Sequence, residues 1–221
     1  MKRTLDLAIA VIAGIVLLPF LAIIAVAIKV DSPGSVLFRQ TRMGANETPF
    51  TILKFRTMRS DAELRKSEVA HLNRHLGADE RMFKIPSDPR VTRVGAFLRR
   101  TSIDELPQLW NVLKGEMSLV GPRPLILEED DYVREWARHR LSLKPGMTGL
   151  WQVLGRSNIP FGEMIRLDYL YVTSWSLAGD VNVPHDIAPV SNTAGRTAVG
   201  SYPRRSRHWV ANSSVHFRRS E

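Results

Sequence analysis

The sequence predicts an α+β fold that is mostly helical, with an apolar membrane segment at the N-terminus and a short β-hairpin in the polar remainder. Three observations support this prediction. Residues 7–28 carry no charge, two short runs rich in strand-forming residues flank Gly44, and most other segments have apolar residues at helical spacing. The 221 residues suit one domain with an appendage.

The uncharged run from Leu7 to Ile28 is long enough to span a bilayer as a straight helix, since 22 residues rise about 33 Å. Three arrangements compete. A signal peptide explains Lys2 and Arg3, but its apolar core usually has only about 7–15 residues. A single span fits the length. However, basic residues flank the run on both sides, and each flank favours the cytoplasmic side of the membrane. A re-entrant helix–break–helix fits both flanks, with the break at Pro19.

The polar part begins with the hairpin and continues with helices. Two strands are predicted over residues 36–42 and 49–58, joined by a turn at 44–46. Four helices are predicted over residues 60–76, 91–100, 128–143 and 161–175. Apolar residues at three- and four-residue spacing in the last helix are predicted to lie in the core, namely Met164, Leu167, Tyr171 and Trp175.

The charge balance narrows the class of partner. The chain has 31 basic and 22 acidic residues and a formal charge of +9, which indicates nucleic acid, anionic lipid or a phosphorylated substrate. A nucleic-acid binder explains the charge but not the apolar run. The chain has no cysteine, which excludes disulfides and cysteine-ligated metals.

Two adjacent acids, Asp104 and Glu105, stand at a predicted helix start. Ser102 and Glu105 have the spacing of a capping box, which is one explanation for the acids. Catalysis is the other. A carboxylate that approaches a phosphorylated substrate needs nearby cations, and Arg99 and Arg123 lie on either side of the pair. The spacing alone leaves both explanations open.

The chain contains six separated sequence blocks between Lys2 and about Asp180: KRTLDL, FRQTRMG, FTILKFRTMRSDAE, SDPRVTRVGAFLRRTSIDELPQLWNVLKGEMSLVGPRP, KPGMTGLWQVLGR and RLDYLYVTSWSL. In this order they resemble the bacterial sugar transferases, the monotopic phosphoglycosyl transferases that begin surface-polysaccharide assembly. The resemblance is to the short form of the family.

This resemblance implies a reaction. The family transfers hexose 1-phosphate from a UDP-sugar to undecaprenyl phosphate and releases UMP, as the first membrane step of exopolysaccharide, capsule or O-antigen synthesis. Asp104 is implied to be the nucleophile of a covalent aspartyl-phosphosugar intermediate, and Glu105 to help hold Mg²⁺. Such chemistry is coherent, because a carboxylate attacks an anionic diphosphate well only when the charge is neutralised. The TGLWQVLGR block suggests glucose or galactose by analogy and identifies neither the hexose nor the pathway.

The resemblance also implies substrate-binding residues. Arg99 and Arg123 are the first candidates for phosphate contact. Further candidates are Lys54, Arg56 and Arg156. The partners implied are a UDP-hexose, undecaprenyl phosphate and bacterial inner-membrane lipid, with no nucleic acid, and a homodimer is allowed.

The family makes the apolar segment re-entrant, with its break at Pro19. The expected organisation is therefore a re-entrant membrane helix over residues 1–30, a phosphoglycosyl transferase domain over 31–180 on the cytoplasmic face of the inner membrane, and a basic tail over 181–221.

The tail departs from the family pattern. Residues 181–221 hold six arginines and two acids, Asp186 and Glu221, with scattered Pro, Gly and Ser and no amphipathic period, a composition typical of disorder. One hypothesis is a reading-frame change near residue 180, and the alternative is a lineage-specific ending. A frame change would also allow a catalytically impaired, membrane-anchored relative as the alternative function.

Overall fold

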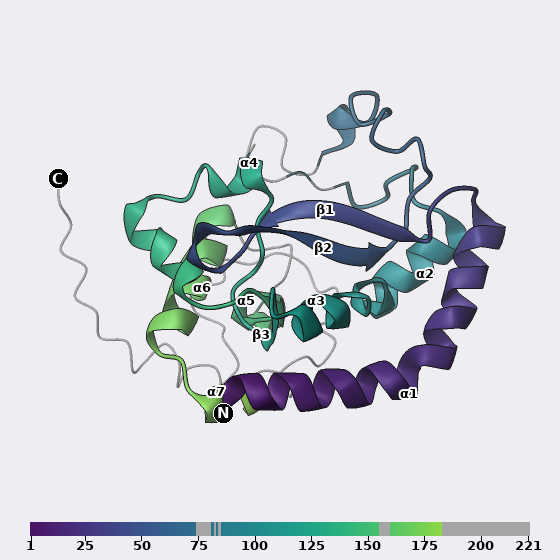
Figure 1. Ribbon diagram of the computed structural model, residues 1–221. Helices are drawn as coiled ribbons and strands as arrows, with labels where there is room; N and C mark the ends of the chain where they lie inside the picture. Colours follow the sequence, from purple (N-terminus) through teal and green to yellow (C-terminus); the bar gives the residue numbers. More distant parts are fainter. Residues whose placement is uncertain (74–80, 82, 84, 155–159, 183–221) are drawn as a thin grey trace.

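The computed structural model describes residues 1–73, 81, 83, 85–154 and 160–182. It has a central β-hairpin with helices packed around it, and α1 follows one side of the domain (Figure 1). In chain order the strands and α-helices are α1 (Lys2–Asp31), β1 (Leu37–Met43), β2 (Pro49–Phe55), α2 (Arg93–Thr101), α3 (Gln108–Lys114), β3 (Ser118–Val120), α4 (Leu127–Asp130), β4 (Gly146–Thr148), α5 (Leu150–Leu154), α6 (Phe161–Thr173) and α7 (Leu177–Asn182). Short 3₁₀ turns are η1 (Ala45–Glu47), η2 (Ala70–Leu72), η3 (Ile103–Glu105) and η4 (Glu135–Ser142). The mostly helical α+β class is confirmed.

The predicted hairpin is present. Strands β1 and β2 pair antiparallel, from Leu37 opposite Phe55 to Met43 opposite Pro49. The connection needs positive backbone φ angles at Asn46 (52°), a residue type that tolerates this region, and at the following Glu47 (58°). Strands β3 and β4, which the sequence did not reveal, form a second, parallel pair.

Helix α1 packs on the domain along its whole length. A stripe of residues at three- and four-residue spacing faces the other elements: Asp6, Ala10, Ala13, Leu17, Leu21, Ile24 and Ile28. The first half of this stripe contacts β2 and α3, and the second half contacts β1, β2 and α2. This stripe explains why α1 lies against the domain and does not project from it.

Both ends of α1 are fastened to the domain by polar contacts. At the start, Lys2 pairs with Asp180, and the Asp6 carboxylate accepts a hydrogen bond of 2.8 Å from the Ser118 hydroxyl. At the end, the Asp31 carboxylate accepts a hydrogen bond of 3.0 Å from the backbone N–H of Val94, at the start of α2. Both ends of α1 are therefore bound to the same polar domain.

The opposite face of α1 is apolar and exposed, and α1 is long and apolar enough to cross a membrane. The exposed residues include Ile9, Ile12, Ile15, Val16, Leu18, Ile23, Val26 and Val30. Pro19, the predicted break, lies inside one continuous helix, which changes direction along its length (Figure 1). A proline removes one backbone hydrogen bond and can bend a helix without ending it.

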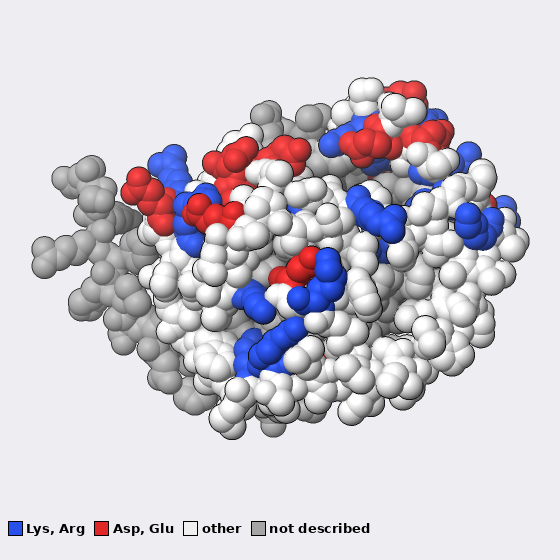
Figure 2. All heavy atoms as spheres, viewed as in Figure 1, with Lys and Arg blue, Asp and Glu red and all other residues white. Residues whose placement is uncertain are grey.

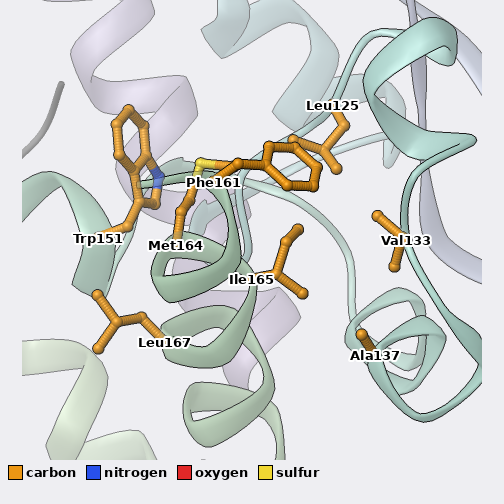
Figure 3. Packing of buried hydrophobic residues seen from close by; sticks show 8 residues of the cluster. All are labelled: Leu125, Val133, Ala137, Trp151, Phe161, Met164, Ile165 and Leu167. Atoms are coloured by element: carbon orange, nitrogen blue, oxygen red, sulfur yellow. The ribbon is translucent and has the colours of Figure 1, made fainter. Parts of the chain in front are cut away.

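A hydrophobic core separate from the α1 contacts lies under α6. Phe161, Met164, Ile165 and Leu167 of this helix pack with Trp151 of α5 and with residues of the α4–η4 segment (Figure 3). Tyr171 is also buried, as predicted, in a neighbouring cluster with Val120 and Leu150. Trp175, predicted to lie in the same core, follows the end of α6 and is 38% exposed.

Two predicted helices are wrong. Residues 60–73 form successive turns with the short η2, because this charged segment buries only Ala62 and Val69 and so has no apolar stripe to stabilise a helix. The predicted helix over 128–143 is divided into α4 and η4. The division lets Arg140 approach Asp130 to 3.7 Å, whereas a straight helix would separate them by about 15 Å.

Candidate active site

The two adjacent acids lie in a single turn between two helices. Helix α2 ends where Ser102 adopts a left-handed conformation with φ of 57°, and η3 then carries Asp104 and Glu105 up to the start of α3. The acids therefore stand at a helix entrance, as predicted. The predicted capping box is absent, because the Ser102 side chain makes no cap hydrogen bond and the Glu105 carboxylate faces a strand instead.

The partner of Glu105 is Lys54 of β2. The Lys54 ammonium donates a hydrogen bond of 2.8 Å to the Glu105 carboxylate. Side chains alternate between the two faces of a strand, so Lys54 shares the face of the buried residues Phe50 and Ile52. The strand therefore directs a cation inward to η3.

Arg42 of β1 joins the same face. It lies directly opposite Phe50 in the hairpin register, and directly opposed residues project from the same face of a sheet. Burial, together with the nearby charge of Arg123, lowers the pKa of Arg42 to about 10. Among the residues that the structure describes, neither the Nε of Arg42 nor that of Arg123 has a hydrogen-bond partner, although both atoms are buried. Two half-buried arginines therefore lie close together, each with a buried Nε donor unused.

These groups surround a pocket of about 70 Å³, lined by Arg42, Ile52, Lys54, Glu105, Gln108, Arg123, Pro124, Gly146, Met147, Trp151 and Gln152. Figure 2 shows acidic and basic side chains gathered around a hollow near the middle of the viewed face. The Arg123 guanidinium lies 4.4 Å from the centre of the Trp151 ring, a cation–π distance. Basic groups on β1, β2 and the Arg123 loop thus face one carboxylate across a polar pocket.

Asp104 is half-buried beside this pocket and does not itself line it. Burial raises the pKa of Asp104, the Lys54 charge lowers it and the neighbouring Glu105 raises it again. The Arg99 charge also lowers it. The electrostatic surroundings of Asp104 therefore include both acids and bases, and a cation or a bound metal would favour its ionised form.

The other predicted binding residues are distributed differently. The Nε of Arg99 donates a hydrogen bond of 2.8 Å to the Thr57 hydroxyl, and Arg99 does not line the pocket. Arg56 is buried elsewhere: its guanidinium donates to the carbonyls of Ser32 and Pro33, which fastens the end of α1 to β2. Arg156 lies outside the described residues.

Among the polar and aromatic residues of the pocket, four were not predicted from the sequence: Arg42, Gln108, Trp151 and Gln152. Arg42 had a usable signal, since the predicted hairpin register already places it on the same face as Lys54. Gln108 stands one turn beyond the acids, at the start of α3. The remaining two lie on α5, which reaches the pocket only through the packing of α5 on α6.

The two acids could hold Mg²⁺ only together with ligands from outside the protein. Within the described part of the chain, no three His, Cys, Asp or Glu residues gather as a metal site. Mg²⁺ commonly needs only one or two protein carboxylates and takes its other ligands from phosphates and water. Asp104 and Glu105 fit that requirement, provided that Glu105 shares its carboxylate with Lys54.

Comparison with known proteins places the chain. A family profile described as bacterial sugar transferase matches residues 1–188. The chain is 45% identical over 183 residues to galactosyl transferase CpsE of Streptococcus agalactiae, covering 82% of this chain and 40% of CpsE. It is 45% identical over 193 residues to the UDP-glucose:undecaprenyl-phosphate glucose-1-phosphate transferase of Caulobacter vibrioides, covering 82% and 66%. To the exopolysaccharide production protein ExoY of Sinorhizobium fredii it is 38% identical, covering 85% and 84%.

The chain spans about two fifths of the length of several curated relatives that it matches, CpsE among them. The matched region nevertheless includes every described element of this chain, from α1 to α7. On the strength of that match, the chain belongs to the bacterial sugar transferase family.

Proposed function

We propose that this protein transfers hexose 1-phosphate from a UDP-hexose to undecaprenyl phosphate. In the first step, a carboxylate oxygen of Asp104 attacks the sugar-bearing phosphorus, the bond from that phosphorus to the bridging oxygen breaks, and UMP leaves. In the second step, an oxygen of the lipid phosphate attacks the same phosphorus. The acyl-phosphate bond breaks, the Asp104 carboxylate returns, and undecaprenyl diphospho-hexose is formed.

One observation carries this proposal. Arg42, Lys54 and Arg123 converge on a pocket whose carboxylate, Glu105, belongs to the same turn as Asp104. Two half-buried arginines, each with a buried Nε donor unused, favour an anion in the pocket for part of the cycle. A diphosphate supplies that anion, and planar guanidinium groups match its oxygens well.

The remaining roles follow from position. Mg²⁺, when bound, would neutralise diphosphate charge, and Glu105 with Asp104 would hold it. Lys54 keeps Glu105 oriented in its absence through the 2.8 Å contact. Arg99 is one helical turn from the acids and would reach a phosphate that enters on the side of α2. The hexose is not specified by these residues, since relatives are named for both galactose and glucose.

We further infer that α1 is re-entrant and that the domain faces the cytoplasm. A straight span would place its two ends on opposite sides of about 30 Å of hydrocarbon. Here Lys2, Asp6 and Asp31 all bind the same polar domain. The exposed apolar face of α1 could then enter one leaflet while the domain rests on the surface, and an uncharged strip follows α1 along the edge of Figure 2.

Release of UMP tests the function directly. Purified protein in detergent or nanodiscs, supplied with Mg²⁺ and undecaprenyl phosphate, should release UMP from one member of a UDP-sugar panel, with matching formation of lipid-linked sugar. Omitting the lipid phosphate should reduce UMP to about one equivalent per enzyme, since the covalent intermediate would accumulate. A folded, membrane-bound protein that releases no UMP with any donor would favour the catalytically impaired relative.

The orientation of α1 leads to a second expected result. Single cysteines placed at Thr4 and Ser60, both exposed, should be protected alike from a membrane-impermeant reagent in intact cells and labelled alike after permeabilisation. Pro19→Leu should straighten α1 and shift a fraction of the molecules toward spanning, seen as labelling at Thr4 alone. Opposite accessibility of the two positions without the Pro19 change would contradict the re-entrant arrangement.

A further inference from the structure

The loop that carries Arg123 has every backbone polar group bound by a residue from another part of the chain. Pro122 and Pro124 have no N–H, so the three residues present one N–H and three carbonyls. The N–H of Gly146 donates to the Pro122 carbonyl at 2.9 Å. The Arg42 guanidinium donates to the Pro124 carbonyl at 3.2 Å. The N–H and the carbonyl of Arg123 are bound by a third group.

That group is a buried ion pair. The Asp168 carboxylate of α6 accepts the backbone N–H of Arg123 at 3.1 Å, and the Arg140 guanidinium of η4 donates to the Arg123 carbonyl. Arg140 and Asp168 also bind each other at 2.8 Å, and each is only 1% exposed. One ion pair therefore binds both backbone polar groups of a single residue, Arg123.

A buried ion pair contributes little net stability compared with apolar packing, so its retention suggests another use. Neither Arg140 nor Asp168 lines the pocket. What they hold is the main chain of Arg123, whose side chain extends to the pocket and rests on Trp151. The Trp151 ring in turn belongs to the core under α6 (Figure 3). The backbone and the side chain of Arg123 are thus held by the same core.

We propose that Arg140 and Asp168 are positioning residues that orient Arg123 toward the nucleoside diphosphate part of the donor. This inference rests on the proposed function. Neither residue touches the donor. They act by keeping the Arg123 loop in the one conformation that directs its guanidinium into the pocket, which spares the donor the cost of ordering the loop on binding.

The test is a double-mutant cycle between Arg140 and Arg123. Arg140→Lys keeps the positive charge but loses the planar fork that binds Asp168 and the Arg123 carbonyl together. Arg123→Ala removes the side chain that the ion pair is proposed to orient. Binding of UDP is measured by calorimetry on both single variants, the double variant and the wild type, and UMP release is measured on the same preparations.

Arg140→Lys should weaken UDP binding by about tenfold and raise the donor KM by a similar factor, with a smaller change in kcat. In the Arg123→Ala background the same change should alter UDP binding by less than about twofold, since the group being oriented is gone. Asp168→Asn should behave as Arg140→Lys does. If it fails to fold, the cycle with Arg140→Lys still decides the matter.

Arg138→Lys is the matched control. Arg138 belongs to the same η4 segment and pairs with Asp130 at 3.6 Å, as Arg140 does at 3.7 Å, but no contact joins it to the Arg123 loop among the described residues. It should leave UDP binding unchanged. Equal loss of UDP binding from Arg140→Lys in both backgrounds, or a folded Arg140→Lys variant with wild-type binding, would overturn the inference.

The two proposals can fail separately. A wild-type protein that binds UDP but releases no UMP would contradict the transfer reaction, while the comparison of UDP affinities would still decide the role of Arg140. A wild-type protein that does not bind UDP would overturn the inference as well, because Arg123 would then have no diphosphate to receive.

Discussion

Asp104→Asn should reduce hexose-phosphate transfer by about 10⁴-fold or more and leave the fold nearly intact. Asparagine has the size of aspartate but cannot form the acyl phosphate. Asp104 is half-buried in the η3 turn, and asparagine keeps a side-chain oxygen that can accept the backbone hydrogen bond that the carboxylate receives there. UMP release gives the rate, and the thermal unfolding curve gives the fold. Mass spectrometry of the wild-type protein quenched without lipid acceptor should find a phosphosugar on Asp104.

Glu105→Gln provides the contrast. Glutamine keeps a hydrogen-bonding oxygen for Lys54 but lacks the charge that would attract Mg²⁺, so the rate should fall less than with Asp104→Asn and the Mg²⁺ requirement should rise. A phosphosugar adduct should still form. If Asp104→Asn kept substantial activity, or if the adduct formed on another residue, the covalent step at Asp104 would be wrong.

Asp180→Ala should destabilise the folded protein by about 2–4 kcal/mol. The Asp180 carboxylate accepts hydrogen bonds from the Tyr171 hydroxyl at 2.6 Å and the Trp175 indole N–H at 3.0 Å, and it also pairs with Lys2. Alanine would leave the Trp175 indole N–H and Lys2 of α1 without their acceptor, and the buried Tyr171 hydroxyl with only the Val120 carbonyl at 3.2 Å. Thermal unfolding in detergent measures the loss, and a protein that melts as the wild type does would show that these contacts contribute nothing.

Truncation supplies the control for Asp180. A chain that ends at Asn182 retains the carboxylate and should keep wild-type stability and transfer, whereas a chain that ends at Ser176 should lose both. The result bears on the unusual basic tail. The predicted basic tail begins just after the last residue whose contacts secure α1, so a change of ending there would spare the described fold. Loss of activity in the chain ending at Asn182 would contradict this view.

Local sequence pattern predicted the parts of the fold that depend on neighbouring residues. The hairpin, α2 and α6 follow from strand alternation and helical spacing, and the apolar run predicted the long α1. The placement of Asp104 and Glu105 at a helix entrance was equally local. Of the two failures, the one over residues 60–73 came where charged residues had good helix propensity but no continuous apolar face to bury. The one over 128–143 came where the chain divides and Arg140 approaches Asp130.

Contacts between distant segments were beyond local pattern, because residue periodicity states which face of an element is buried and not what covers it. Glu105 pairs with Lys54, 51 residues away, and the local capping bond with Ser102 does not form. Arg56 binds the backbone carbonyls just after α1 and does not line the pocket. Trp151 reached Arg123 only because α5 packs on α6. Propensity and charge along the chain thus defined the elements and the position of the two adjacent acids. The burial of charged side chains, each of which needs a partner, determined which distant residues complete the pocket.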